Sequence, residues 1–320
     1  MERKKIIICV PNFAKHCTDA MKLLTGQGYE LVLNPHQRPL SDQELHQWAT
    51  DAHAAIIGNE KWSGDLIRSL KYMSLFSRFG VGIDNLDLIA AKEKGIRITR
   101  SLGANTNAVA EFTITMMLAA IRHVPFFDQT TKDGQWQRLP GLEMSGKTVG
   151  LIGYGAIAQR VSQLLKGFDV RILVHTRSPG KAGPEDVKIQ FASLDQLLQE
   201  SDIVSLHLPG SSETTHIIDA DALSAMKKGA ILINTARGSH IDESALYEAL
   251  QGKHIRCAAL DVFATEPTDA TFKLFSLDNV LVSPHTAGAT VESYVRMGND
   301  SAQAAVDYFH GKIPKNGFVT

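Results

Sequence analysis

The chain has 320 residues, of which 44% are hydrophobic and 21% charged, and its formal net charge at pH 7 is −1. This length suffices for two domains, and the composition is that of a globular chain rather than a disordered one. The near-neutral charge gives no reason to expect nucleic acid or a membrane as a partner, and no apolar run approaches the roughly 18 residues of a membrane span.

The cysteine and histidine patterns indicate no metal site. The three cysteines, Cys9, Cys17 and Cys257, are not in CxxC spacing, and the histidines are scattered without ligand spacing. The N-terminus "MERKKIIICVPNF" is basic, but its apolar run is too short for a signal peptide. We therefore expect a reduced, cytoplasmic protein.

The first third of the chain alternates short apolar runs with amphipathic stretches. Residues 14–28 show a helical pattern that ends at Gly26 and Gly28. Such alternation predicts a parallel sheet with helices on both faces. The strands are expected at 5–10, 54–58, 72–77 and 96–99.

A long helix is expected next, at 106–124, with Asn105 as its N-cap. It is apolar around much of its circumference, which indicates burial between domains or subunits. A second alternating series follows. Its strands are expected at 148–153, 170–175, 203–208, 230–235, 257–262 and 279–284, and its helices at 156–166, 194–199, 221–226 and 242–251.

The stretch "GLIGYGAIA" is typical of a dinucleotide-binding turn. Gly153 ends a predicted strand, and Gly155 precedes a predicted helix, so the backbone can approach a pyrophosphate there. Ala158 takes the third glycine position and is small enough for close packing of helix on strand. The alternative is a tight packing turn in another α/β fold.

The acidic residue that usually follows such a turn by about 20 positions is missing. The second strand ends in "VHTRS", and the nearest acid, Asp169, lies before that strand. Thr176, Arg177 and Ser178 stand where the acid would be. Arginine binds phosphate oxygens in a bidentate manner, so this pattern favours NADP(H). The alternative is that Arg177 stacks on adenine, in which case NAD(H) is accepted.

Three polar residues follow three predicted strands at their carboxyl ends, where ligands bind in open α/β sheets. They are Arg237, Glu266 and His285. Taken singly, each can be a turn or capping residue. Together they suit hydride transfer to a 2-oxo acid: arginine holds a carboxylate and polarises a carbonyl, histidine supplies a proton, and a carboxylate orients its ring.

The motifs together resemble the D-isomer-specific 2-hydroxyacid dehydrogenase family, which includes phosphoglycerate dehydrogenases and glyoxylate/hydroxypyruvate reductases. The resemblance covers nearly the whole chain in matching order. It is carried by "SRFGVGIDNLDLIAAKEKGIRIT", "GANTNAVAEFTITMMLA", "GLIGYGAIA", "HLPGSSETTHII", "INTARGSHIDESAL", "ALDVFATEP" and "SPHTAGAT".

The resemblance implies a role for each matching residue. Arg237 would bind the substrate, His285 would be the acid/base and Glu266 its partner. Asp261 would bond the nicotinamide carboxamide. The substrate set would be Arg78, the backbone N–H groups of Val81 and Gly82, Arg237 and His285. The cofactor set would be Gly153, Gly155, Ala156, Ile157, Thr176, Arg177, Ser178, His207, Leu208, Pro209, Thr214, Thr235, Ala236, Arg237, Asp261, His285, Ala287 and Gly288.

The resemblance also implies the domain organisation. Residues 1–101 and 289–320 would form a flavodoxin-like substrate domain, and residues 102–288 an inserted Rossmann domain. A homodimer through the long helix is expected. Phe112 replaces a histidine that many members carry, so no polar role is assigned to it. The segment "WQRLPGLEMSGKT" is shorter than the usual pattern, which leaves Arg138 without a clear counterpart as a substrate contact.

The sequence leaves two kinds of enzyme in the family, with different substrates, as alternatives. A 2-oxo acid reductase of the glyoxylate/hydroxypyruvate type fits the absent ribose acid, whereas an NAD-linked D-3-phosphoglycerate dehydrogenase, with Arg78 on a distal phosphate, is the alternative. A formate dehydrogenase is disfavoured because those enzymes carry glutamine at the position of Glu266. A nucleotide-sensing corepressor of the same fold is the remote alternative, disfavoured because the chain has no extra tail.

Overall fold

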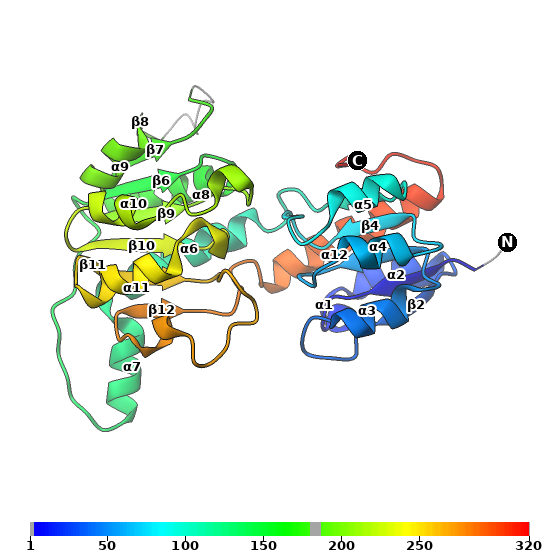
Figure 1. The fold of residues 1–320 in the computed structure, drawn as a ribbon, viewed down its shortest axis with the longest axis horizontal. Helices are drawn as coiled ribbons and strands as arrows, with labels where there is room; N and C mark the ends of the chain where they lie inside the picture. Colours follow the sequence, from blue (N-terminus) through cyan, green and yellow to red (C-terminus); the bar gives the residue numbers. More distant parts are fainter. Residues whose placement is uncertain (1–2, 180–186, 320) are drawn as a thin grey trace. The chain divides into compact units, whose positions relative to one another are not determined.

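The computed structural model describes residues 3–179 and 187–319 and divides into two compact units (Figure 1). The first unit joins Met1–Asn105 to Ala289–Thr320, and the second comprises Thr106–Gly288. The expected boundary after residue 101 lies close to the one after Asn105. Each unit contains a parallel sheet, so the predicted two-domain α/β fold class is confirmed.

The first unit contains a five-stranded parallel sheet in the order β2-β1-β3-β4-β5. Its strands are β1 (Lys5–Ile8), β2 (Glu30–Leu33), β3 (Ala54–Ile57), β4 (Leu75–Arg78) and β5 (Arg97–Arg100). Ile7 of β1 faces one apolar cluster, while Ile6 and Ile8 face the other. This alternation of side chains buries both faces of the sheet and explains the unbroken apolar run.

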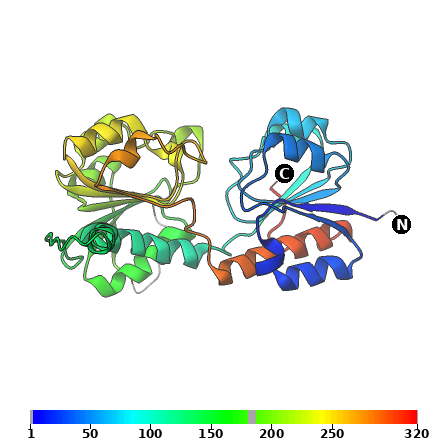
Figure 2. The same ribbon diagram turned by 90° about the horizontal axis from the view of Figure 1, so that it is seen from below.

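Helices cover both faces of this sheet (Figure 2). One face packs against α3 (Asp42–Ala49), α4 (Gly64–Ser69) and α5 (Leu88–Glu93), and the other against α1 (Phe13–His16), α2 (Thr18–Gly26) and α12 (Val291–Phe309). The last helix returns the chain to this unit, where it packs on α2 and β4. The hydroxyl of Ser77 donates to the carbonyl of Ser301, at 2.9 Å.

The second unit contains a seven-stranded parallel sheet in the order β12-β11-β10-β9-β6-β7-β8. The direction of strand order reverses at the β6/β9 pair, which is where such sheets bind ligands. The strands are β6 (Thr148–Ile152), β7 (Arg171–His175), β8 (Ile189–Phe191), β9 (Ile203–Leu206), β10 (Ala230–Asn234), β11 (Ile255–Leu260) and β12 (Val280–Val282).

The helices of the second unit also form two layers (Figures 1 and 2). One layer holds α6 (Thr106–Arg122) and α8 (Ala156–Leu165), and the other holds α9 (Leu194–Glu200), α10 (Ala220–Ala225) and α11 (Glu243–Gln251). Short 3-10 turns complete the loops: η1 (Lys166–Phe168), η2 (Ser212–Thr214), η3 (Gly238–His240) and η4 (Lys273–Ser276).

The predicted long helix is present as α6, which packs on α8 and on strands β10 and β11. Its predicted cap is wrong: Asn105 Oδ1 is buried without a hydrogen-bond partner, so it caps no backbone N–H. A second helix, α7 (Val124–Lys132), follows and extends away from the body of the unit (Figure 1).

In the described part of the chain no single helix is long and apolar enough to cross a membrane. The pair α6 and α7 meets the length and composition test only jointly, and it is bent by 62° at its junction.

Two strands were missed by the sequence prediction, β2 and β8. Both lie at a sheet edge, and their side chains are mostly half-buried or exposed. An edge strand buries less apolar surface, so its sequence lacks the continuous apolar run of a central strand. The other ten strands lie within or next to the predicted ranges.

Candidate active site

The turn between β6 and α8 has the geometry of a dinucleotide-binding turn. Gly153 has a φ of +92°, in the left-handed region, and its N–H donates to the carbonyl of His175 at 2.8 Å. A Cβ atom at this position would lie 2.6 Å from the carbonyl oxygen of His207. Both the backbone conformation and the close approach of the neighbouring loop therefore require glycine here.

The residues at the start of α8 fit a pyrophosphate. Gly155 is the N-cap of this ten-residue helix, and no side chain caps its first turn. A Cβ atom on Gly155 would meet nothing within 4 Å, so space is left beside the turn. Ala156 and Ile157 supply further N–H groups at the positive end of the helix dipole. An anionic group is the partner that such a terminus favours.

The end of β7 carries the residues expected at the ribose. Thr176, Arg177 and Ser178 follow the strand, and the Thr176 hydroxyl accepts the N–H of Ser178 at 3.4 Å. The guanidinium of Arg177 forms an ion pair with the carboxylate of Glu213 in η2. An acid therefore does reach the end of β7, although it comes from another loop. Sequence reasoning missed Glu213, because nothing in the local spacing links two exposed residues so far apart in the chain.

The loop after β9 is fixed by buried polar groups. Burial lowers the pKa of His207 to about 4, so its ring is neutral at physiological pH, and its Nε2 lies 3.0 Å from the hydroxyl of Ser205. The Thr214 hydroxyl donates to the carbonyl of Pro209, at 2.9 Å. The ring of His240 lies between the carbonyls of Leu208 and Thr214, at 3.0 and 3.2 Å. These contacts hold residues 207–214 in one conformation.

The turn after β10 presents Arg237. Asn234, fully buried, accepts the N–H of Ala236 at 3.0 Å and donates to the carbonyl of Arg237 at 2.8 Å. A Cβ atom on Gly238 would lie 1.8 Å from the backbone carbon of Phe263, so only glycine allows this turn to pack on the segment after β11. Asn234 was not identified from the sequence. The buried hydroxyl of Thr235 lies 2.9 Å from that of Thr113 in α6.

Asp261, directly after β11, organises the segment that carries His285. Its carboxylate accepts the Ser283 hydroxyl at 2.6 Å and the N–H groups of Thr286 and Ala287 at 2.8 and 2.9 Å. Burial raises the pKa of Asp261, and these donors together with His285 oppose that shift. The sequence prediction gave Asp261 a contact with the cofactor; the structure adds that it already holds the backbone around His285.

His285 and Glu266 form a hydrogen-bonded pair. Nδ1 of His285 lies 2.6 Å from Oε2 of Glu266, whose other oxygen accepts the N–H of Phe263 at 2.9 Å. His285 has a φ of +51°, and its N–H donates to the carbonyl of Asp261 at 2.7 Å. A carboxylate acceptor at Nδ1 fixes the tautomer, so Nε2 is the nitrogen that can exchange a proton with a ligand.

The three predicted catalytic residues thus follow three adjacent strands, at the carboxyl ends of these strands. Strand β11 pairs with both β10 and β12, and Arg237, Glu266 and His285 follow these three strands in turn. The contact between Glu266 and His285 is direct. Nη1 of Arg237 donates to the carbonyl of Ala236 at 2.6 Å. Such a set can bind an anion, polarise a carbonyl and move one proton.

The predicted substrate residues of the first unit lie at the end of β4, which Arg78 closes, and in the loop after it, which holds Val81 and Gly82. Arg78 is buried, and its guanidinium donates to the carbonyl of Gly82 at 2.7 Å, to Oδ1 of Asn59 at 2.8 Å and to the carbonyl of Gly58. These bonds give Arg78 a structural role in holding its loop. The substrate contacts of Arg78, Val81 and Gly82 stay predictions. Arg138 is exposed in the loop after α7.

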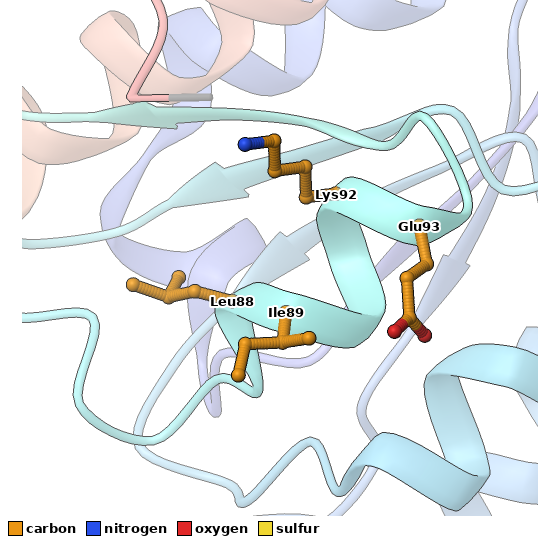
Figure 3. A pocket seen from close by; sticks show the side chains of 4 residues that line it. All are labelled: Leu88, Ile89, Lys92 and Glu93. Atoms are coloured by element: carbon orange, nitrogen blue, oxygen red, sulfur yellow. The ribbon is translucent and has the colours of Figure 1, made fainter.

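A shallow surface pocket lies along α5 in the first unit (Figure 3). Leu88, Ile89, Lys92 and Glu93 line it, and their side chains diverge from one short helix. Nothing in this arrangement converges on a ligand. Among the residues that the structure describes, no group of three or more histidine, cysteine or acidic side chains could hold a metal ion.

Comparisons with known proteins identify the family of the chain. Residues 114–287, more than half of the 320-residue chain, match the family described as "D-isomer specific 2-hydroxyacid dehydrogenase, NAD binding domain". The chain is 40% identical over 308 residues to a glyoxylate reductase from Aeropyrum pernix, covering 93% of this chain and 92% of that protein. It is 41% identical over 286 residues to a hydroxypyruvate reductase from Thermotoga maritima, covering 88% of this chain and 91% of that protein.

The structural comparison agrees with the sequence comparison. A crystal structure of a glyoxylate reductase from Paecilomyes thermophila matches with a TM-score of 0.86 at 27% identity, covering 100% of this chain and 98% of that chain. The glycine turn at the switch point of a parallel sheet, with the His285–Glu266 pair at the same sheet, is consistent with a nucleotide-dependent oxidoreductase. The chain belongs to the D-isomer-specific 2-hydroxyacid dehydrogenase family, and it is an NAD(P)-dependent D-2-hydroxyacid dehydrogenase.

Proposed function

We propose that the enzyme reduces a small 2-oxo acid of the glyoxylate or hydroxypyruvate type to the D-2-hydroxy acid, with NADP(H) as the preferred cofactor. The observation that carries the proposal is the hydrogen bond between His285 and Glu266, at 2.6 Å, on the sheet edge that also presents Arg237. The names of the two reductases to which the chain is about 40% identical support the substrate class.

The proposed mechanism assigns one task to each residue. The Arg237 guanidinium holds the substrate carboxylate and withdraws electron density from the carbonyl oxygen. A nicotinamide cofactor, which the turn at Gly153 and Gly155 and the carboxylate of Asp261 would hold, would supply the hydride that the carbonyl carbon accepts. As the carbonyl π electrons move to the oxygen, His285 gives it the proton of Nε2, and Glu266 stabilises the ring before that transfer. In the oxidative direction, neutral His285 takes the proton from the hydroxyl.

The cofactor preference rests on the end of β7. Thr176, Arg177 and Ser178 offer a cation and two hydroxyls, and the described residues 176–179 after β7 include no carboxylate to bond the ribose hydroxyls. A 2′-phosphate suits these donors better than a hydroxyl pair does. NAD(H) is the alternative cofactor if Arg177 stacks on the adenine instead.

The substrate preference favours the reductase over a phosphoglycerate dehydrogenase. The only distal-phosphate ligand suggested by the sequence is Arg78, whose guanidinium donates to backbone and side-chain oxygens of its own unit. These bonds support a structural role in place of phosphate binding.

We also propose that the enzyme is a homodimer through α6, α7 and the loop after them. The exposed apolar side chains of this region, Val124, Trp136 and Leu139, support a second copy as the partner, and Trp136 is 79% exposed. Apolar side chains gathered on one protruding region are typical of an interface. Sedimentation equilibrium tests this assembly. A monomer at micromolar concentration would contradict it. The cytoplasmic location stays a prediction.

The experiment that tests the proposed reaction is a steady-state panel of 2-oxo acids with NADPH and NADH in parallel. Glyoxylate and hydroxypyruvate should give higher kcat/KM values than 3-phosphohydroxypyruvate, and chiral chromatography of the glycerate formed from hydroxypyruvate should show the D isomer. A preference for the phosphorylated substrate would overturn the substrate proposal, and an L product would overturn the assigned roles of Arg237 and His285.

A further inference from the structure

The ion pair between Arg177 and Glu213 joins two segments that the cofactor prediction treats separately. Arg177 follows β7 in the predicted ribose site, and Glu213 belongs to η2 in the loop after β9. Their side chains are 73% and 69% exposed, respectively. The pair is therefore open to solvent, and a solute anion can reach the guanidinium.

The η2 turn keeps the Glu213 carboxylate close to Arg177. The next residue, Thr214, is buried, and its hydroxyl lies 3.2 Å from that of Ser211 and donates to the carbonyl of Pro209 at 2.9 Å. The carbonyl of Thr214 lies 3.2 Å from Nδ1 of the buried His240. These contacts fix the backbone next to Glu213, so its exposed carboxylate stays within reach of the guanidinium and competes with an arriving anion.

A carboxylate and a 2′-phosphate are alternative partners for the same guanidinium. Both accept its parallel N–H groups, and a phosphate that takes the place of Glu213 also lies next to a negative charge. A ribose 2′-hydroxyl carries no charge and gains little from displacing the carboxylate. The pair therefore acts differently on the two cofactors.

We propose that Glu213 is a residue that determines cofactor selectivity: it occupies Arg177 and so weakens the binding of NADP(H) relative to NAD(H). The inference rests on the proposed role of Arg177 at the 2′-phosphate. The carboxylate that β7 itself lacks is thus brought to Arg177 from η2.

The test is Glu213→Gln, which removes the charge and keeps the side-chain size. Isothermal titration calorimetry with adenosine 2′,5′-bisphosphate and with adenosine 5′-monophosphate isolates the 2′-phosphate from the rest of the cofactor, and NADP⁺ and NAD⁺ are titrated in parallel. The affinity for the bisphosphate and for NADP⁺ should rise about two- to five-fold, the range expected for an exposed ion pair. The affinities for the monophosphate and for NAD⁺ should change by less than about two-fold.

The matched control is Glu200→Gln. Glu200 pairs with Arg171 at 2.6 Å, both partly exposed, at the opposite end of the same strand β7. This variant loses a comparable ion pair and should leave all four affinities unchanged. The double variant Arg177→Gln/Glu213→Gln, compared with Arg177→Gln, completes the experiment, because the gain from Glu213→Gln should largely disappear without the guanidinium.

Two results would overturn the inference: an unchanged or lower bisphosphate affinity in Glu213→Gln, or a gain of the same size when Arg177 is absent. Failure of the proposed cofactor preference has a different signature. In that case wild-type protein binds the bisphosphate no more tightly than the monophosphate, whatever Glu213→Gln does.

Discussion

The hydride-transfer end and the ribose end of the second unit are built in opposite ways. Around His285, the backbone is held by the buried carboxylate of Asp261, which accepts three hydrogen bonds, and the ring by Glu266 at 2.6 Å. At the ribose end, Arg177 and Glu213 meet in solvent through one exposed ion pair. The buried bonds of Asp261 are costly to break, whereas exposed ion pairs are worth little. The contact between His285 and Glu266 lies between these cases, with side chains 33% and 30% exposed.

This difference indicates at which end a substitution should disturb the structure of the site and at which end it should mainly change the affinity for the cofactor. The proposed chemistry requires a proton donor placed within hydrogen-bond reach of one atom. The backbone that carries His285 is held by the buried carboxylate of Asp261. In the proposed ribose site, the choice of cofactor would depend on a single phosphate beside exposed side chains, where small changes in charge shift its binding. Substitutions at the two ends should therefore differ in size and in what they alter.

The largest effect is expected from His285→Ala. Loss of the proton donor should lower kcat by about 10²- to 10⁴-fold. The Kd for NADP⁺, measured by fluorescence titration, should stay within about two-fold, because the pyrophosphate and ribose contacts do not involve the ring. Glu266→Gln keeps an acceptor for Nδ1 and should lose less activity than His285→Ala. Turnover at the wild-type rate in His285→Ala would show that another group is the acid.

A smaller but still large effect is expected from Asp261→Asn. The amide can accept only part of the bonds that the carboxylate accepts from Ser283, Thr286 and Ala287. The His285 segment should shift, and kcat should fall by about 10- to 100-fold, the size of loss that misplacement of a reacting group produces. Ser283→Ala removes one of the three bonds and serves as the graded comparison. Equal kcat values for Asp261→Asn and wild type would contradict the positioning role.

At the ribose end, Thr176→Asp should change the cofactor rather than the chemistry. A carboxylate beside the 2′-phosphate repels it and can bond the ribose hydroxyls of NAD. The ratio of kcat/KM values for NADPH and NADH should fall by about ten-fold or more, with kcat itself less affected. Thr176→Asn has the same shape without the charge and should shift the ratio less. Unchanged selectivity for NADPH in the aspartate variant would remove this segment from the ribose site.

The smallest effect concerns the loop after β9 and the pH dependence of stability. Burial lowers the pKa of His207 from 6.5 to about 4, so between these values the unfolded chain binds a proton that the folded chain does not. The free energy of unfolding should therefore fall as the pH is lowered through this window. The free energy of unfolding of His207→Gln should fall less steeply with pH than that of the wild type, as measured by urea titrations at pH 4.5, 5.5, 6.5 and 7.5 (about one pH unit apart). The exposed His216, changed to Asn, is the control. Parallel slopes for His207→Gln and wild type would contradict the lowered pKa of His207.

Much of the fold and of the catalytic edge could be predicted from the sequence. Central strands bury both faces and read as continuous apolar runs, and the carboxyl ends of parallel strands share one edge. That rule alone was enough to place Arg237, Glu266 and His285 together, and the family resemblance then supplied their roles. The glycine turn could be predicted equally well, because the space and the backbone conformation at position 153 require glycine, and a glycine is visible in the sequence.

The remaining features depend on contacts between segments far apart in the chain. Glu213 reaches Arg177 from another loop, and His240 lies between two carbonyls of residues 208–214. Arg78 donates to oxygens of neighbouring loops, where the sequence left a substrate contact and a structural contact equally open. None of these pairings has a fixed spacing or an apolar period. The expected cap at Asn105 failed for a related reason, since a capping residue type does not fix where its side chain points.

The central claim, reduction of a small 2-oxo acid with NADP(H), is tested most directly by one ratio in the wild-type enzyme. It is kcat/KM for NADPH divided by kcat/KM for NADH, measured with hydroxypyruvate at saturating concentration. The residues at the end of β7 predict a ratio well above one, about ten or more if Arg177 contributes a charge-assisted bond to the 2′-phosphate. A ratio of one or below would contradict the account and assign the enzyme to NADH.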